Sequence, residues 1–270
     1  MRVGVPKEIK VHEYRVGLTP ASVAELVAAG HAVIVETKAG GGIDFSDQDY
    51  VKVGATIAAD AAEVFANSDM IVKVKEPQPQ EIALLESRHL LFTYLHLAPD
   101  PDQARGLMAS GATCIAYETV TANDGSLPLL KPMSEVAGRM SIQVGAHYLE
   151  KEQGGRGVLL GGVPGVAPAR VMILGGGIAG VNAAQMAVGM RADVTIYDIS
   201  NARLAELDMF FGSQIKTAYA SKAAIADAVT HASLVIGAVL VPGAAAPGTR
   251  TAPITRLAWA TASAIAAFEA

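Results

Sequence analysis

Apolar and polar residues alternate in two ways along the first half of the chain. Short runs rich in β-branched and aromatic residues have the length and period of strands, and stretches with apolar residues at helical spacing lie between them. This alternating order predicts a parallel sheet covered by helices. We expect strands at 2–6, 31–37, 70–75, 89–96 and 112–120, and helices at 20–30, 61–68, 77–87 and 100–111.

The helix expected at 20–30 has clear signals at both ends. Thr19 offers a hydroxyl as N-cap, and Pro20 suits the first helical position. Gly30 is a typical residue just beyond a helix end. The sequence therefore predicts the bounds of this helix as well as its existence.

A second α/β unit is expected after a long linking helix. Residues 133–152 have helical spacing without a strand signal, and a glycine-rich connector follows them. The strand "VMIL", the helix "AGVNAAQMAVGM" and the strand "DVTIYDI" come next. We therefore predict an α/β protein with two doubly wound parallel-sheet domains: a first domain over 1–132, the linking helix over 133–152, a second domain over 153–247 and a tail over 248–270.

Composition narrows the class of protein. The 270 residues, 51% of them hydrophobic, suffice for a real core, and the net charge of −5 with no basic stripe excludes a nucleic-acid partner. The single Cys114 excludes an internal disulfide and indicates a buried thiol in a reducing compartment. Because the sequence begins without a leader pattern and Pro242 interrupts the most apolar later stretch, we expect a cytoplasmic protein without a membrane span.

Three glycines form a G-x-G-x-x-G motif between the strand and the helix of the second unit. Gly175 permits a tight turn, Gly177 lets the backbone approach a pyrophosphate, and Gly180 lets helix and strand pack closely. The N-terminus of the helix offers unpaired N–H groups and the positive end of the helix dipole to phosphates. Since glycine-rich loops also serve as plain turns, the motif needs support from its surroundings.

An acidic residue at the end of the next strand gives that support. Asp198 lies roughly 20 residues beyond the glycines, where a carboxylate accepts a hydrogen bond from a ribose 2′-OH. The alternative is a cap for the helix that follows it. Strand, glycine loop, helix, strand and acid together predict a Rossmann-type dinucleotide site. A carboxylate there repels a 2′-phosphate, which favours NAD over NADP, although the nearby Arg203 weakens that preference.

Candidate catalytic residues follow the strands of the first unit. Ligands of open α/β sheets bind beyond the carboxyl ends of the strands. Lys75, His96 and Glu118 lie at three successive strand ends, and Arg15 lies in the loop after the first strand. The alternatives are ordinary surface charges for Arg15 and Lys75, an ion-pair partner for Glu118, and a core or rim histidine for His96. Their shared edge nevertheless predicts one site.

These residue types suit the oxidation of a small amino acid. The planar guanidinium of Arg15 matches a carboxylate, and Lys75 adds a second positive charge. Histidine exchanges protons near neutral pH, so His96 suits proton transfer with the amine or with water that attacks an imine, while a nicotinamide accepts the hydride. No Ser-His-Asp spacing, Cys/His metal cluster or phosphate loop ending in G-K-[ST] occurs, so hydrolase, zinc-enzyme and kinase functions lack support and no metal is expected.

Several long motifs resemble the alanine dehydrogenase family from Met1 to about Pro247. They are "MRVGVPKEIKVHEYRVGLTP", "VKVKEPQPQE", "LLFTYLHLAP", "AYETV", "LPLLKPMSEVAGRMS", "GGRGVLLGGVPGV" and "VIGAVLVPGA". The resemblance implies an oxidoreductase of amino-acid catabolism that interconverts L-alanine plus NAD with pyruvate, ammonium and NADH. It also implies a homohexamer.

The same resemblance implies roles for individual residues. Arg15 of "EYR" binds the substrate carboxylate, Lys75 of "VKVK" also contacts substrate, and His96 of "YLHL" is the acid/base candidate. At one further cofactor contact, where family members often have serine, this chain has Ala220. The implied cofactor contacts are Ser134, Gly175, Gly177, Gly180, Asp198, Arg203, Val239 and Leu240.

A related protein, the NAD-binding subunit of proton-translocating transhydrogenase, shares the implied architecture. Lys75 and His96 in their motifs, and "MSEVAGRMS" in the linking helix, favour alanine dehydrogenase over this subunit. The transhydrogenase subunit stays as an alternative.

The tail after Pro247 departs from the family pattern. The family continues with further strands of the nucleotide domain, a catalytic aspartate and closing helices, whereas residues 248–268 contain no acid and resemble none of these. We expect a chain truncated or altered here, a nucleotide domain incomplete at its C-terminal side, and no strand of the expected kind in the tail. The alternative is that residues 256–270 form a short replacement helix. Two hypotheses stay open: an active alanine dehydrogenase, and a catalytically impaired remnant that binds NAD.

Overall fold

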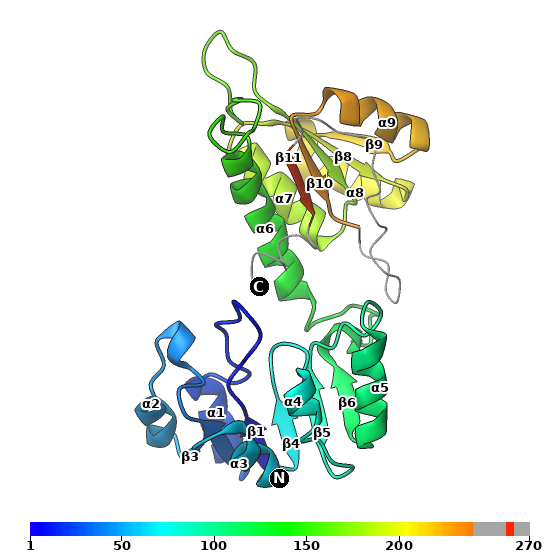
Figure 1. Cartoon of the computed structure of the whole chain (residues 1–270). Coiled ribbons are helices and arrows are strands. Elements are labelled where there is room, and N and C mark those ends of the chain that lie inside the picture. Colours follow the sequence, from blue (N-terminus) through cyan, green and yellow to red (C-terminus); the bar gives the residue numbers. More distant parts are fainter. Residues whose placement is uncertain (240–257, 262–270) are drawn as a thin grey trace. The chain divides into compact units, whose positions relative to one another are not determined.

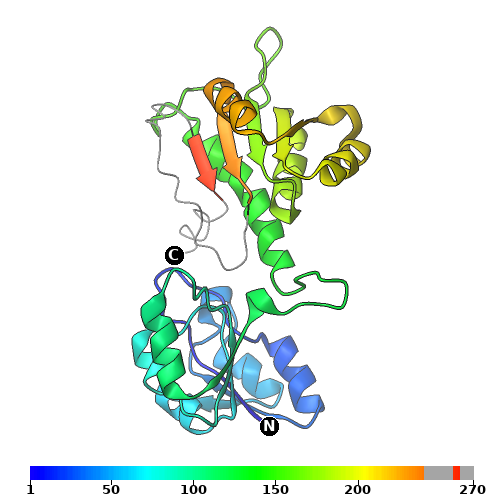
Figure 2. The same cartoon turned by 90° about the vertical axis from the view of Figure 1, so that its right-hand side faces the viewer.

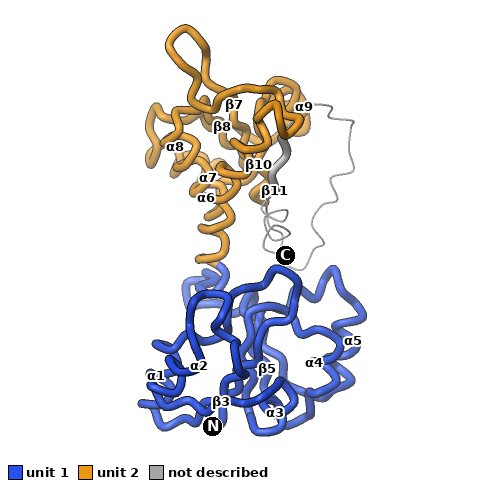
Figure 3. Tube along the Cα trace, turned by 60° about the vertical axis from the view of Figure 1, so that its left-hand side comes forward, with its two compact units in different colours: residues 1–130, 270 blue, residues 131–269 orange. Residues whose placement is uncertain are grey.

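The computed structural model describes residues 1–239 and the backbone of residues 258–261. The chain forms two compact units, one over residues 1–130 and one that begins at Lys131 (Figures 1 and 3). Each unit contains a parallel β-sheet with helices packed against it. The α/β class with parallel sheets, predicted from the alternation of strand and helix patterns, is confirmed.

The sheet of the first unit has the strand order β3-β2-β1-β4-β5-β6, and every pair is parallel. The chain moves outward from β1 to β3 and then returns to the other side of β1, which makes the β1–β4 boundary a topological switch point. The strands are β1 (Arg2–Val5), β2 (Ala32–Glu36), β3 (Thr56–Ala58), β4 (Met70–Val72), β5 (Leu90–Thr93) and β6 (Thr113–Ala116).

Helices cover both faces of this sheet (Figure 2). Val3 and Val5 of β1 pack into a core with α1 and α2, whereas α3 and α5 pack on the opposite face. Gly4 points to that opposite face, where a Cβ would lie 2.3 Å from Ser68 Oγ, so glycine permits the close approach of α3. The helices are α1 (Pro20–Ala28), α2 (Asp47–Lys52), α3 (Ala61–Ala66), α4 (Pro79–Ile82) and α5 (Pro101–Ser110), with short turns η1 (Gly41–Ile43) and η2 (Tyr117–Thr119).

The predicted end signals of α1 are confirmed. The Thr19 hydroxyl accepts a hydrogen bond from the backbone N–H of Ser22, Pro20 is the first helical residue, and Gly30 has a φ of +84°. The sequence did not predict α2 and β3. A capping box between Ser46 and Asp49 marks the start of α2 and was the available signal.

The described part of the second unit contains a sheet of order β11-β10-β7-β8-β9, again parallel throughout. Helices α6, α7 and α8 contribute to one core cluster, and α9 packs on the other face. The strands are β7 (Arg170–Leu174), β8 (Asp193–Asp198), β9 (Lys216–Tyr219), β10 (Leu234–Gly237) and β11 (Ala258–Thr261); the helices are α6 (Lys131–Tyr148), α7 (Ile178–Gly189), α8 (Asn201–Phe211) and α9 (Lys222–His231), with η3 (Gly212–Gln214).

Strand β11 contradicts the prediction that the tail has no strand of the expected kind, and it contradicts the alternative of a helix at residues 258–261. Its four residues pair in parallel with β10, from Ala258 opposite Leu234 to Thr261 opposite Gly237. Helix propensity is a weak preference, and pairing with the edge of a sheet overrides it here. The expectation that this tail lacks a strand is therefore wrong, and the remainder of the alternative helix lies outside the described residues.

Cys114 is half-buried rather than fully buried. It lies on β6, the edge strand of the first sheet, where its neighbours Thr113 and Ile115 are exposed. Partial burial raises the pKa of its thiol.

Across residues 1–239 and 258–261, no helix is long and apolar enough to cross a membrane.

Candidate functional site

Four predicted site residues lie at one edge of the first sheet. Strands β1, β4, β5 and β6 are neighbours in that order and all parallel, so the segments that leave their carboxyl ends emerge at the same edge. Arg15 lies in the loop after β1, Lys75 follows β4, His96 follows β5, and Glu118 belongs to η2 directly after β6. The topology thus brings together residues that are far apart in the sequence.

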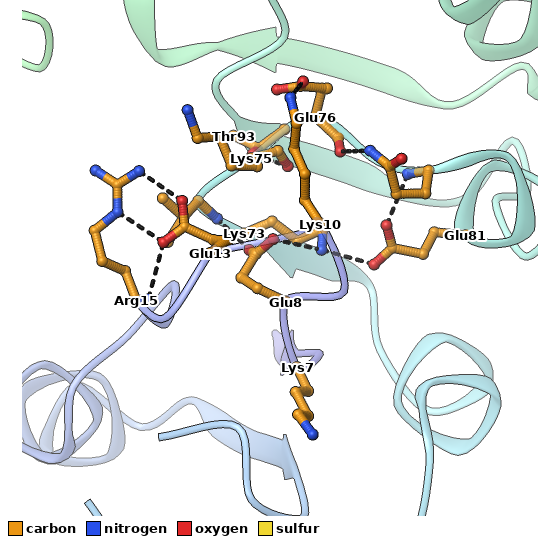
Figure 4. Close-up of polar contacts among 12 residues, drawn as sticks. Lys7, Glu8, Lys10, Glu13, Arg15, Lys73, Lys75, Glu76, Glu81 and Thr93 are labelled. Atoms are coloured by element: carbon orange, nitrogen blue, oxygen red, sulfur yellow. Dashed lines mark hydrogen bonds and ion pairs between the residues drawn. The ribbon is translucent and has the colours of Figure 1, made fainter. Parts of the chain in front are cut away.

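Glu13 orients the guanidinium of Arg15 (Figure 4). Arg15 Nε donates to Glu13 Oε1 at 2.8 Å, and Nη2 donates to Oε2 at 2.6 Å. The backbone N–H of Arg15 also donates to Oε1, at 2.9 Å. Burial raises the pKa of Glu13, but these hydrogen bonds and the positive charges of Arg15 and Lys75 outweigh burial, and the pKa falls below its ordinary value.

Lys75 is a buried cation at this edge, with 7% of its surface exposed. Its backbone carbonyl accepts a hydrogen bond from Thr93 Oγ1 at 2.9 Å, which ties the exit of β4 to the end of β5. Its charge acts on the Glu13 carboxylate, which Arg15 also contacts. Two cations, Arg15 and Lys75, therefore lie near the one buried carboxylate of Glu13.

His96 lies in a turn with left-handed backbone, at a φ of +46°. The carboxylate of Glu118 accepts hydrogen bonds from the backbone N–H groups of Leu95, at 3.1 Å, and His96, at 2.7 Å. Left-handed backbone is strained for residues other than glycine, and charge-assisted hydrogen bonds offset that strain. Glu118 therefore has a structural task at this turn, and the catalytic role predicted for it stays a prediction.

The imidazole of His96 lies between Tyr94 and Glu76. It stacks on the Tyr94 ring, with ring centroids 6.0 Å apart, and its Nδ1 lies 3.6 Å from Glu76 Oε2. The ammonium of Lys10 donates to the other carboxylate oxygen of Glu76. Burial raises the pKa of Glu76, but the nearby His96 imidazole and the Lys10 ammonium outweigh burial and lower the pKa to about 2. Glu76 is therefore ionised at neutral pH.

A buried group of three charges supports the same edge from inside (Figure 4). Lys73 is fully buried, and its ammonium donates to Glu8 at 3.1 Å and to Glu81 at 2.6 Å. Glu8 also accepts a hydrogen bond from the backbone N–H of Val74 at 2.6 Å. Burial outweighs these favourable contacts and raises the pKa of Glu8. This cluster ties the loop after β1 to the segment that carries Lys75.

The glycine motif of the second unit has the geometry that its sequence predicts. Gly175 has a φ of +96°, and Gly177 is the N-cap of α7, with open space where a Cβ would lie. A Cβ on Gly180 would lie 1.9 Å from the carbonyl oxygen of Gly175, so only glycine allows this helix to pack on the loop. The open face at Gly177 and the N–H groups of the first turn of α7 together suit a pyrophosphate.

Asp198 and Arg203 both hold the glycine loop. Asp198, the last residue of β8, accepts a hydrogen bond from the backbone N–H of Gly176 at 2.7 Å, and Arg203 Nε donates to the Gly176 carbonyl at 2.7 Å. The N-cap of α8 is Ser200 rather than Asp198. Because each carboxylate oxygen has two lone pairs, Asp198 can also accept a hydrogen bond from a ligand hydroxyl. Arg203 additionally pairs with Glu206 at 2.5 Å.

The remaining predicted cofactor residues lie at the start of α6 and after β10. Ser134 is half-buried in the first turn of α6, one turn before Gly138, which packs directly against Ala179 of α7. Val239 follows β10 and lies beside Gly175, where a Cβ would approach Val239 Cγ2 to 3.1 Å. Leu240 lies outside the described residues.

The described residues place the substrate candidates in the first unit and the cofactor candidates in the second. Whether Arg15, Lys75 and His96 face the glycine loop stays a prediction.

The sequence analysis did not predict that Lys10 binds Glu76 or that Tyr94 stacks on His96. The available signals were a cation and an aromatic residue close to strand ends. No cluster of three or more His, Cys, Asp or Glu side chains suited to a metal occurs within residues 1–239.

Two family models match the chain over most of its length. The model described as "Alanine dehydrogenase/PNT, N-terminal domain" matches residues 4–137, and "Alanine dehydrogenase/PNT, C-terminal domain" matches residues 141–254. Among curated relatives, the "Alanine dehydrogenase" of Halomonas elongata is 57% identical over 229 residues, which are 85% of this chain and 62% of the relative. That of Bacillus subtilis is 54% identical over 85% of this chain and 60% of the relative. The chain thus spans about three fifths of the length of these relatives.

Solved structures give the same result. A structure titled "L-alanine dehydrogenase" matches with a TM-score of 0.84 and 56% identity, covering 92% of this chain and 68% of that one. A transhydrogenase structure from Sinorhizobium meliloti matches with a TM-score of 0.77 and 26% identity, covering 92% of this chain and 73% of that one. The matched family models, the identities and the shared fold together show that the chain belongs to the alanine dehydrogenase/PNT family.

Proposed function

We propose that this chain is an NAD-dependent alanine dehydrogenase, which oxidises L-alanine to pyruvate and ammonium and reduces NAD. Identities of 52–57% to proteins named alanine dehydrogenase support this activity. The structural observation that most supports this activity is the position of three residues at one edge of the first sheet. Each follows the carboxyl end of one of the neighbouring parallel strands β1, β4 and β5: Arg15, Lys75 and His96.

In this proposal Arg15 and Lys75 bind the substrate carboxylate. The plane of the Arg15 guanidinium is fixed by two hydrogen bonds to Glu13, and a guanidinium held in one plane loses little further freedom when it binds a carboxylate. Lys75 adds a second charge with little exposure to water. Because charges interact more strongly away from water, this pair favours a small substrate with a carboxylate group.

His96 is the proton carrier in this proposal. Loss of one proton from the ammonium group of L-alanine to solvent, and of a hydride from Cα, leaves a protonated imine, and water then attacks the imine carbon. His96 accepts a proton from the amine or from that water and returns it to the departing nitrogen, which leaves as ammonium. Its ring is half-exposed at the carboxyl-end edge, where substrate and water have access.

The second unit provides the residues that would hold NAD. The N–H groups at the start of α7 and the open backbone at Gly177 suit the pyrophosphate, and Asp198 suits the ribose 2′-OH. A bound nicotinamide supplies the hydride acceptor. The carboxylate of Asp198 repels a 2′-phosphate, so NAD is preferred to NADP.

The compartment and the oligomeric state are two further proposals. We propose that the protein works in the cytoplasm and assembles as a homohexamer. Analytical ultracentrifugation of the purified chain tests the assembly: a sedimentation coefficient that corresponds to six chains supports it, and a monomer at micromolar concentration contradicts it.

The activity is tested with purified protein, L-alanine and NAD. We expect NADH absorbance to rise with stoichiometric formation of pyruvate, and no rise with D-alanine. Binding of NAD without any NADH formation would instead support the impaired remnant. Reduction of NAD by NADPH, when the chain is combined with the other transhydrogenase components, would support the transhydrogenase alternative, for which the solved relative is 26% identical.

A further inference from the structure

Among the described residues, one carboxylate oxygen of Glu76 lacks a hydrogen-bond partner. The side chain is 16% exposed, and Oε1 accepts a hydrogen bond from the ammonium of Lys10 (Figure 4). Oε2 is buried and has no hydrogen-bond partner in the part of the chain that the structure describes. Buried polar atoms nearly always have such a partner, so an unpaired oxygen next to a predicted site requires an explanation.

The group that faces this oxygen is the imidazole of His96. Nδ1 of His96 lies 3.6 Å from Oε2, which is an ion-pair distance slightly longer than a hydrogen bond. A small rotation of the half-exposed ring about its side-chain torsions closes the gap. Nδ1 and Nε2 lie on opposite sides of an imidazole ring, so a ring that donates Nδ1–H to Glu76 directs Nε2 away from the carboxylate.

Other groups around His96 restrict the ring without replacing Glu76. The Tyr94 ring stacks on it at an interplanar angle of 24°. Glu118 engages the backbone N–H of His96 at 2.7 Å rather than the imidazole, and Lys10 binds the far oxygen of Glu76. Among the described residues, Glu76 is therefore the carboxylate in position to bond Nδ1.

We propose that Glu76 is a positioning residue for His96: its carboxylate accepts the Nδ1–H of the imidazole and thereby fixes the tautomer whose Nε2 carries the free electron pair. This inference rests on the proposed function of His96 as proton carrier. Nε2 takes a proton from substrate amine or water, the resulting imidazolium is stabilised by the adjacent carboxylate, and Glu76 stays ionised throughout. The same logic, an acid that orients a histidine, operates in other enzymes with unrelated folds.

The test is the tautomer of His96, read by long-range proton–nitrogen NMR in the whole chain. Wild type should show a protonated Nδ1 and an unprotonated Nε2 at a pH where the ring is neutral. Glu76→Gln should populate both tautomers and lower kcat for L-alanine by about 10- to 100-fold, with KM changed less than about threefold. Glu76→Asp, which keeps a carboxylate, should retain most of the Nδ1–H signal and most of the activity.

A second His–Glu pair in the chain provides the matched control. His147 Nδ1 lies 3.5 Å from Glu150 Oε2, but both side chains are more than half exposed. Glu150→Gln should leave kcat unchanged and leave the His147 tautomers close to those of a free imidazole. The comparison shows whether a buried carboxylate fixes the histidine tautomer when an exposed carboxylate at a similar distance does not.

The outcomes separate this inference from the proposed function. An unchanged Nδ1–H tautomer of His96 in a folded Glu76→Gln variant overturns the positioning role, whatever the activity. Full alanine oxidation by His96→Ala overturns the proposed role of His96, even where the tautomer depends on Glu76. If Glu76→Gln fails to fold, the tautomer of Glu76→Asp decides: loss of the Nδ1–H preference there contradicts the inference.

Discussion

The carboxylate of Glu118 accepts a hydrogen bond from the backbone N–H of His96 at 2.7 Å and so holds the turn in which His96 has a φ of +46°. The direction of the imidazole depends on this backbone conformation, because a change in φ rotates the whole side chain. Glu118 therefore affects the site through the backbone, from a position 22 residues along the chain.

Replacing Glu118 tests this relationship. Glu118→Ala leaves the N–H groups of Leu95 and His96 without their acceptor, so we expect a loss of about 1–3 kcal/mol in the free energy of unfolding. Hydrogen exchange at these two amides should accelerate. Glu86→Ala is a control on the same unit, since the Glu86 side chain is exposed and pairs with Arg88. Unchanged exchange at Leu95 and His96 in Glu118→Ala would refute the structural task.

Two glycines of α7, one crowded and one in open space, test the role of the glycine loop in binding NAD. Gly180→Ala places a Cβ 1.9 Å from the Gly175 carbonyl oxygen, so the helix must shift and the phosphate-binding loop must distort. We expect destabilisation of more than about 1 kcal/mol and at least a tenfold weaker affinity for NAD. Gly189→Ala, on the same helix with nothing within 4 Å, should be neutral or stabilising by up to about 1 kcal/mol. Equal NAD affinities of the two variants, measured by calorimetry, would contradict the assignment of the loop.

The preference for NAD over NADP depends on Asp198 in our account. Asp198→Asn removes the charge that repels a 2′-phosphate, so the ratio of NADP to NAD dissociation constants should fall by at least tenfold. Asp193→Asn is the control, because Asp193 begins the same strand and pairs with Lys216. Fluorescence titration with both cofactors measures the ratio. Tighter binding of NADP than of NAD by the wild type would contradict the role of Asp198.

Acid should weaken the fold through Glu76. Its pKa in the folded chain is about 2, against an ordinary value of 4.5, so its ionised form stabilises the folded state above pH 4.5. That stability is lost as pH falls from about 4.5 toward 2. The difference in unfolding free energy between wild type and Glu76→Gln should therefore be about 1 kcal/mol smaller at about pH 4 than at about pH 6. Urea unfolding at both pH values measures it, and an equal difference at the two would count against the ion pairing of Glu76.

Local signals in the sequence predicted those parts of the fold that depend on local chemistry. The caps of α1 and the glycines before α7 are set by neighbouring residues, so both could be predicted. Strand β11 could not, because its conformation comes from pairing with β10 rather than from its own helix-forming composition. Helix α4 is shorter than the expected 77–87 and ends at Ile82, which the apolar spacing of that stretch did not reveal.

In the candidate site too, the sequence predicted some features, whereas others depend on contacts between distant residues. Parallel topology alone was enough to place Arg15, Lys75 and His96 at one sheet edge. The contacts that orient them join distant positions: Lys73 and Glu8 are 65 residues apart. No periodicity or spacing rule connects such pairs, so only the folded chain reveals them.

Steady-state NADH formation by His96→Ala measures the proposed chemistry most directly. With saturating L-alanine and NAD, the wild type should form NADH, and His96→Ala should form it at least ~100-fold more slowly while binding NAD with unchanged affinity. His147→Ala, which removes another half-exposed histidine from the second unit, should retain the wild-type rate. NADH formation by His96→Ala at the wild-type rate would contradict the assignment of this sheet edge as the site of alanine oxidation.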